Sequence, residues 1–254
     1  MVQRFKSVGG LDIANILVTQ SDAPSHMMVP LTHWQACLRA APFLEDRPQR
    51  MARSEADLIA TSRAPEMIFA AAASPRPGDV IPIPPTKSFN QGLSSASEAT
   101  MLHLLGVPGQ KTTDCSPTSA ELRKRISSGV DVGPFKVTGL KIAVDLLKKV
   151  FDEAQEMIPN VVAAVKNDGM LCVRLKRHSN TSFSNHSWGT AIDLFFGDAA
   201  VPMGENKTAR GCQQLAPFFN KHGWYWGAGF SGSSVDSMHF ELAEETIKAA
   251  LGGG

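Results

Sequence analysis

A proline-rich stretch at residues 75–86, PRPGDVIPIPPT, constrains the fold of this chain more than any other feature, because it holds five of the 16 prolines. Proline removes backbone donors and favours extended polyproline conformation, so the stretch is predicted to be a stiff linker or an edge segment. It divides the 254 residues into an N-terminal region, 1–74, a linker, 75–88, and a larger domain, 89–254.

The charge balance and the hydropathy pattern exclude several classes of protein. Twenty-five Lys and Arg offset 24 Asp and Glu, so binding of nucleic acid through bulk charge is not expected. No apolar run reaches the roughly 18 residues of a membrane span. The first apolar segment, LDIANILV, is interrupted by Asp12 and Asn15, so no classical signal peptide is predicted and synthesis in the cytoplasm is expected.

The four cysteines are far apart in the sequence and form no C-x-x-C pair. This spacing excludes a disulfide-dense scaffold and a cysteine-rich zinc finger, and it fits a protein made in a reducing compartment.

Hydrophobic periodicity predicts an α+β domain after the linker. The clearest helix spans 140–157, with Thr138 as a plausible N-cap and Pro159 just past its end. Alternating residues predict a strand over 171–176. The remaining expected elements are helices at 94–105 and 243–251 and short strands at 191–196 and 238–242. The predicted fold class is therefore a small antiparallel sheet with flanking helices, plus a separate N-terminal region with a helix over 52–73.

Two segments of the larger domain carry residues suited to chemistry: SNHSWGTAID at 184–193 and DSMHFE at 236–241. His186, Asp193 and His239 are the ligand types that a catalytic zinc takes when one position stays open for water. Asp236, three residues before His239, could reach that water as a general base. A serine or cysteine nucleophile is the alternative, but no G-x-S-x-G occurs and Cys172 and Cys212 lack a local signature.

The pattern S-x-H-x-x-G-x-A-x-D followed by D-x-M-H-F-E closely resembles the D-alanyl-D-alanine carboxypeptidase and L-alanoyl-D-glutamate endopeptidase family of zinc peptidases, over about 95–245. The resemblance implies that His186, Asp193 and His239 bind zinc and that Asp236 is the catalytic acid/base. Glu241 is the competing carboxylate. On an extended strand it shares a face with His239, so it could instead orient that imidazole.

The same resemblance implies an arginine that stabilises the oxyanion, for which Arg174 is favoured over Arg177. Ser184 is expected to brace the metal loop by hydrogen bonding. Trp188, Trp224 and Trp226 are interpreted either as core residues or as an aromatic wall beside the substrate.

The resemblance further implies hydrolysis of bacterial peptidoglycan stem peptides by an endopeptidase, as in an endolysin, or by a carboxypeptidase. A zinc-containing binding module without catalysis is the alternative. We expect no nucleic-acid partner and no membrane-spanning segment. Without a signal, the protein would reach the cell wall after lysis or by dedicated secretion, and residues 1–88 could contact a delivery partner.

Overall fold

The computed structural model describes residues 74–177, 179–197 and 200–252. The chain divides into two units, Met1–Phe69 and Ala70–Gly254, and the described helices and strands all belong to the second. The predicted helix at 52–73 lies outside the described residues.

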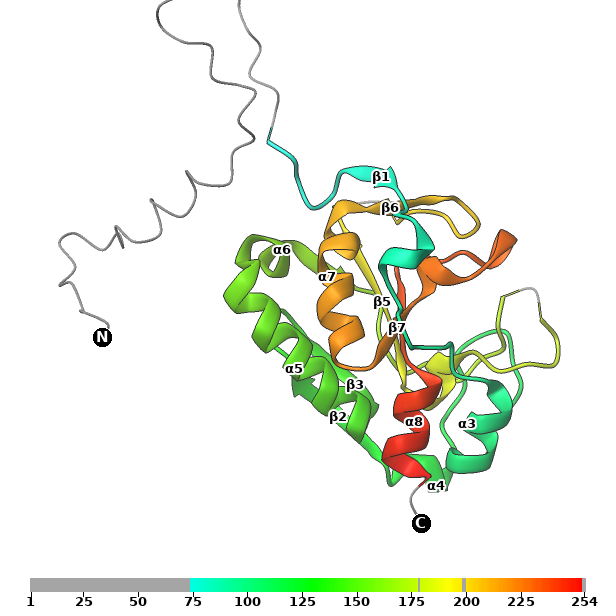
Figure 1. Cartoon of the computed structure of the whole chain (residues 1–254). Coiled ribbons are helices and arrows are strands. Elements are labelled where there is room, and N and C mark those ends of the chain that lie inside the picture. Colours follow the sequence, from blue (N-terminus) through cyan, green and yellow to red (C-terminus); the bar gives the residue numbers. More distant parts are fainter. Residues whose placement is uncertain (1–73, 178, 198–199, 253–254) are drawn as a thin grey trace, which may run out of the picture. The chain divides into compact units, whose positions relative to one another are not determined.

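An antiparallel sheet with strand order β4-β5-β8-β7 forms the centre of the second unit (Figure 1). Its strands are β4 (Val165–Asn167), β5 (Ala191–Phe196), β7 (Trp224–Trp226) and β8 (His239–Leu242). Two-stranded antiparallel pairs are formed by β2 (Ile126–Asp131) with β3 (Lys136–Leu140) and by β1 (Val80–Pro82) with β6 (Lys207–Ala209). Both strands predicted at 191–196 and 238–242 are confirmed, as is the mixed fold class with small antiparallel sheets.

Helices flank these strands (Figure 1). The α-helices are α3 (Glu98–Leu105), α4 (Ala120–Arg123), α5 (Lys141–Met157), α6 (Pro159–Ala164), α7 (Arg210–Lys221) and α8 (Glu244–Leu251), and the short 3-10 helices are η2 (Thr86–Ser88), η3 (Asn185–Trp188), η4 (Gly227–Gly229) and η5 (Gly232–Ser234). Helix α7 packs on β5 and β7, α5 packs on α7, and α3 lies beside α8. No described helix is both long and apolar enough to cross a membrane.

The start of α5 differs from the prediction. Thr138 is not its N-cap: Leu140 is, without a side-chain cap. Thr138 instead belongs to β3, where its hydroxyl accepts a hydrogen bond from the Gly129 amide across the hairpin, at 3.1 Å. Pro159 does follow the end of α5, and it opens α6 at a position where its missing N–H costs nothing.

The segment 171–176 is not a regular strand, although its alternating burial is as predicted for Val173 and Leu175. It forms only isolated bridges, Ser116 with Val173 and Leu175 with Phe183. The segment therefore lies between two irregular stretches of chain rather than at the edge of a sheet.

Part of the proline-rich segment 75–88 forms an edge strand, which the sequence analysis gave as the alternative to a linker. Strand β1 pairs with β6, and the carbonyls of Pro77 and Asp79 accept hydrogen bonds from the Gly211 and Arg210 amides at 2.8 and 2.9 Å. These two amides are in the first turn of α7, whose N-cap offers no side-chain acceptor. The segment thus supplies partners for otherwise unsatisfied helix donors.

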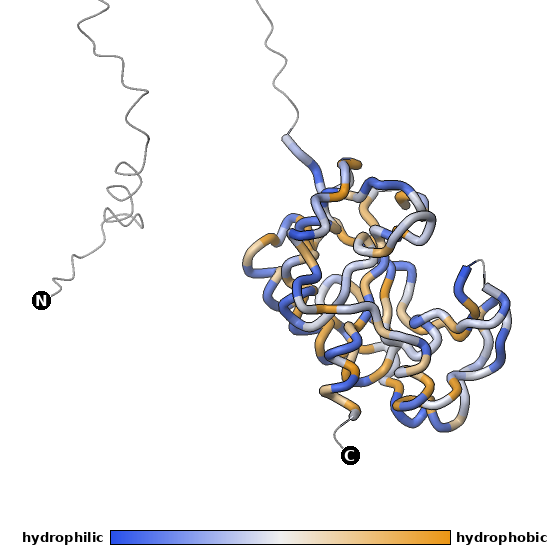
Figure 2. Tube along the Cα trace, turned by 45° about the vertical axis from the view of Figure 1, so that its right-hand side comes forward, coloured by the Kyte–Doolittle hydropathy of each residue, from blue (hydrophilic) through white to orange (hydrophobic). Residues whose placement is uncertain are grey.

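One continuous core joins the sheet and the helices around it, and hydrophobic segments gather at the centre of the domain in Figure 2. Cys212 lies in this core as a free thiol. In contrast, Cys115 and Cys172 form a disulfide, which the expectation of a reducing compartment did not foresee. Disulfides persist mainly in oxidising environments.

Candidate metal centre

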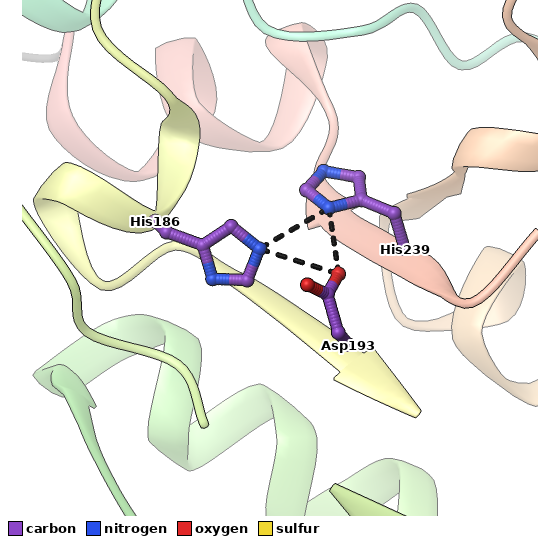
Figure 3. Close-up of side chains that lie close together, drawn as sticks. All are labelled: His186, Asp193 and His239. Carbon is purple, nitrogen blue, oxygen red and sulfur yellow. Dashed lines mark hydrogen bonds and ion pairs between the residues drawn. The ribbon is translucent and has the colours of Figure 1, made fainter. Parts of the chain in front are cut away.

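Three side chains from three different elements point toward one another (Figure 3). His186 comes from η3, Asp193 from β5 and His239 from the start of β8. Asp193 and His239 are direct partners in the antiparallel register, so their side chains project from the same face. His186 Nε2 lies 3.3 Å from Asp193 Oδ1 and 3.3 Å from His239 Nδ1, and the third edge, His239 Nδ1 to Asp193 Oδ1, is 3.0 Å.

The second nitrogen of each imidazole has its own acceptor. His186 Nδ1 lies 3.1 Å from the Met170 carbonyl, and His239 Nε2 lies 2.9 Å from Glu241 Oε2. A hydrogen on each of these nitrogens leaves the other nitrogen with a free lone pair. Those lone pairs belong to the atoms that face Asp193. When the rings are neutral, as in a metal complex, these acceptors therefore favour the tautomers that bind a metal ion.

The spacing of the three donor atoms fits a tetrahedral zinc site. Bonds of about 2.0–2.1 Å in a tetrahedron separate neighbouring ligand atoms by about 3.3–3.4 Å. The observed separations of 3.0–3.3 Å lie within a few tenths of an ångström of this value. His186, Asp193 and His239 could thus hold a metal ion, with a fourth position left for another ligand.

Glu241 is the buried anchor of His239. Its carboxylate also accepts from the Ser95 hydroxyl at 2.6 Å, the Ala96 amide at 3.1 Å and the Asn185 amide group at 2.8 Å. Burial acts to raise its pKa, but His239 and these donors outweigh burial and hold the pKa below its usual range. With its oxygens engaged in this way, Glu241 is a charged partner of the imidazole.

The charges of the metal-free site are strongly coupled. Burial opposes ionisation of both Asp193 and His239, yet their mutual attraction prevails. Proximity to His186 and His239 keeps the pKa of Asp193 far below its usual range. Hydrogen bonds and charges from Asp193 and Glu241 raise the pKa of His239 to about 10. The cluster is therefore preorganised for a cation: without a metal ion, the proton on His239 supplies the positive charge that offsets Asp193.

The three residues line an open groove of about 430 Å³. Arg174, Arg177 and Asp236 line the same groove, so the structure brings the predicted base and both arginine candidates to the candidate ligands. Burial, with Asp193 nearby, raises the pKa of Asp236, while His239, the Met238 amide and Arg177 act in the opposite direction. Such a carboxyl has an increased affinity for protons.

Of the remaining predicted residues, one lines the groove and the others lie in the core. Ser184 lines the groove and braces the loop through its backbone: its amide donates to the Arg174 carbonyl at 3.0 Å. Trp188 and Trp226 are buried in the core, where their indoles donate to the Gly106 and Ser237 carbonyls. We therefore assign both rings to packing rather than to substrate contact. Trp224 is equally buried.

The sequence did not predict that Phe230, Met170 and the Cys115–Cys172 pair contribute to the site. Phe230 forms part of the groove wall and packs against His239 with ring centroids 5.8 Å apart. Met170 contributes only a carbonyl, for which the sequence holds no signal. Cys115 and Cys172 line a second pocket that shares His186 and Asp193 with the groove.

The fold and the site together define an α+β domain with a candidate metal centre of two histidines and one aspartate in an open groove. Residues 177–242 match the family model described as D-alanyl-D-alanine carboxypeptidase. The matched range includes both motifs, so the predicted family resemblance is confirmed, and the match supports a peptidase. No curated protein shows significant sequence similarity to the chain.

Proposed function

We propose that this protein is a zinc metallopeptidase that hydrolyses peptide bonds in the stem peptides of bacterial peptidoglycan. The proposal includes an L-alanyl-D-glutamate endopeptidase and a D-alanyl-D-alanine carboxypeptidase as its two forms. Support comes from the family match over residues 177–242 and from the chemistry of the groove. Peptidoglycan lies outside the cytoplasm, so the enzyme acts there after lysis or through dedicated secretion.

One observation carries the proposal: the donor atoms of His186, Asp193 and His239 form a triangle with edges of 3.0–3.3 Å, open to a groove. A purely structural zinc site has four protein ligands and no open position. Only three groups of this kind come together here among the described residues. Three ligands beside an open groove support a catalytic rather than a structural site.

A bound zinc ion would polarise the scissile carbonyl and lower the pKa of water in the site. Asp236 then serves as the general base, taking the proton of the attacking water and passing it to the leaving amine. Its raised pKa suits both steps, because it moves the carboxyl towards the pH at which the enzyme works. Arg174 supplies positive charge to the carbonyl oxygen as it becomes an oxyanion.

The walls of the groove suit an extended peptide with both charged and apolar groups. The lining includes the apolar side chains of Val201, Met203, Phe230 and Met238 and the cationic side chains of Arg174, Lys176 and Arg177. Alanine methyl groups and carboxylates are the matching groups of a stem peptide. Such a combination of apolar lining and a few polar groups is usual for small-ligand sites.

Mass spectrometry of the muropeptides released from purified peptidoglycan by the zinc-loaded protein tests this function. A new free amine on D-Glu identifies the endopeptidase, and loss of a terminal D-Ala identifies the carboxypeptidase. Absence of any product with zinc bound would contradict the proposal and favour a zinc-containing binding module.

Asp236→Asn separates catalysis from binding. The amide keeps the size of the side chain but cannot accept the proton, so we expect turnover to fall about 10²–10⁴-fold. Zinc content and peptide binding should stay near those of the unchanged protein. Turnover within tenfold of that protein would show that another group, with Glu241 as the competing carboxylate, is the base.

A further inference from the structure

The segment Met170–Leu175, here called the strip, lies against the candidate metal centre at every second residue, 170, 172 and 174. The Met170 carbonyl faces His186 Nδ1 at 3.1 Å, and the Cys172 amide donates to the His186 carbonyl at 3.1 Å. Arg174 extends into the groove from the same strip. A displacement of the strip would therefore disturb both a ligand and the arginine.

The inner side of the strip lies along the loop that carries His186. The Ser187 hydroxyl donates to the Arg174 carbonyl at 2.8 Å and accepts from the Arg174 amide at 3.0 Å. The Ser184 amide donates to the same carbonyl at 3.0 Å. These bonds transmit the position of the strip directly to the metal loop.

The outer side of the strip is held by the loop 109–118. Two backbone hydrogen bonds cross between them, from Leu175 to the Thr112 carbonyl at 2.8 Å and from Ser116 to the Val173 carbonyl at 2.9 Å. The third link is the Cys115–Cys172 disulfide, with the Cα atoms 4.9 Å apart. The strip has only isolated bridges in place of regular strand pairing, and this link is its one covalent connection to the loop.

We propose that Cys115 and Cys172 are positioning residues of the metal site, because their disulfide holds the strip where Met170 fixes the His186 tautomer and Arg174 faces the groove. This inference rests on the metal site of the proposed function. It has a functional consequence: the protein binds its metal tightly when oxidised and weakly when reduced. An enzyme of the cell wall would then be assembled fully only outside a reducing cytoplasm.

The bond is open to reagents, since Cys115 is exposed and Cys172 is only partly buried. A water-soluble phosphine reduces it: the S–S bond breaks, two electrons come from phosphorus, and water supplies the two thiol protons and the oxygen of the phosphine oxide. Removal of the phosphine by gel filtration without oxygen leaves no phosphine to compete for zinc, and the serine variant below excludes zinc binding by the two free thiols.

The test is the zinc dissociation constant of the full-length protein, oxidised and reduced, measured against a chromophoric chelator at a temperature where circular dichroism shows both forms folded. We expect reduction to weaken zinc binding 10–100-fold, the usual effect of losing a group that orients a metal-bound histidine. Reoxidation with glutathione disulfide should restore the affinity. The double variant Cys115→Ser/Cys172→Ser should match the reduced protein and not respond to reoxidation.

Leu147→Ala is the matched control, because Leu147 is fully buried in α5 and belongs to neither the strip nor the groove. It lowers thermal stability without releasing the strip, so its zinc affinity should stay within about threefold of that of the oxidised protein. Equal affinities of the folded oxidised and reduced forms would overturn this inference alone, as would an equal loss in Leu147→Ala. An oxidised protein that binds no zinc would contradict the proposed function as well.

Discussion

Each functional side chain of the groove depends on a partner that fixes its chemical state. Met170 and Glu241 face the second ring nitrogens of His186 and His239, and burial raises the pKa of Asp236 above its usual value. A group acts at such a site only in the right protonation state and orientation. The chemistry at the residue scale is therefore set by pairs rather than by single residues.

The two arginines of the groove differ in burial, and this difference predicts their effects. Arg174 is half-buried, whereas Arg177 is exposed. Solvent screens the charge of the exposed group more strongly. Arg174→Gln should lower kcat/KM about 10²–10³-fold, as loss of an oxyanion donor does, mainly through kcat. Arg177→Gln should cost less than tenfold. The opposite order, measured with a defined stem peptide, would assign the oxyanion role to Arg177.

Metal binding should depend on pH through His239. Asp193 and Glu241 raise its pKa to about 10 against the effect of burial, so the metal-free ring is protonated at neutral pH. Zinc binds the neutral ring and must displace this proton. Affinity should therefore rise with pH, about tenfold per unit between pH 6 and 9. Calorimetry in buffers of different ionisation enthalpy should show about one proton released, and an affinity independent of pH would contradict this coupling.

At the scale of elements, the site is a junction between a regular sheet and irregular loops. Strands β5 and β8 bring Asp193 opposite His239, and the parity of β8 places Glu241 behind His239. The His186 loop has no such ladder. It depends on a tight turn and on a close contact with the β2–β3 hairpin, where the Leu140 amide donates to the Gly189 carbonyl at 2.9 Å.

Gly189 ends η3 and tests this dependence. Its φ is +66°, and a Cβ there would lie 2.8 Å from both the Gly139 Cα and the Leu140 amide nitrogen. Gly189→Ala should therefore cost at least about 2 kcal/mol in unfolding free energy, from left-handed backbone and steric overlap together. It should also weaken zinc binding, because the overlap displaces the adjacent His186 loop.

Gly129→Ala is the matched control for Gly189→Ala. Gly129 has a similar φ of +65°, but nothing lies within 4 Å of a Cβ at that position. This variant should show only the backbone cost, about 1–2 kcal/mol, with unchanged zinc affinity. Urea unfolding and chelator competition measure both effects. Equal losses in the two variants would show that the contact with the hairpin is unimportant.

The regular elements explain how far the sequence could predict the site. The period of two along a strand determines which of its residues share a face, so the placing of Glu241 on the side of His239 follows from short-range pattern. The position of Asp193 opposite His239 depends on the register between β5 and β8. The strip 170–175 has the same alternation, yet it forms no ladder. The Met170 carbonyl and the Cys115–Cys172 link depend on how distant loops pack around it, and a backbone carbonyl carries no sequence signal.

At the scale of the whole molecule, part of the segment predicted as a linker, 75–88, bonds to elements of the domain predicted at 89–254. Pro77 and Asp79 accept hydrogen bonds from the first turn of α7, and β1 pairs with β6. All the side chains that build the metal centre nevertheless lie after residue 89. We therefore expect that full stability requires residues before 89, whereas metal binding does not.

Two truncated proteins test this expectation. A fragment of residues 74–254 keeps β1 and the acceptors for α7, so its melting temperature and zinc affinity should resemble those of the full chain. A fragment of residues 89–254 leaves the Arg210 and Gly211 amides without these partners. We expect this to lower its free energy of unfolding by about 1–3 kcal/mol in all. For a unit of this size we expect a melting temperature lower by about 3–10 °C.

Zinc affinity of the shorter fragment, measured well below its melting temperature, should stay within about threefold of the full chain. His186, Asp193 and His239 keep Met170 and Glu241, and Glu241 keeps its donors Ser95 and Ala96. A large loss of affinity in the folded 89–254 fragment would show that the proline-rich segment shapes the groove itself. Unchanged melting would instead show that solvent replaces the lost acceptors of α7 without cost.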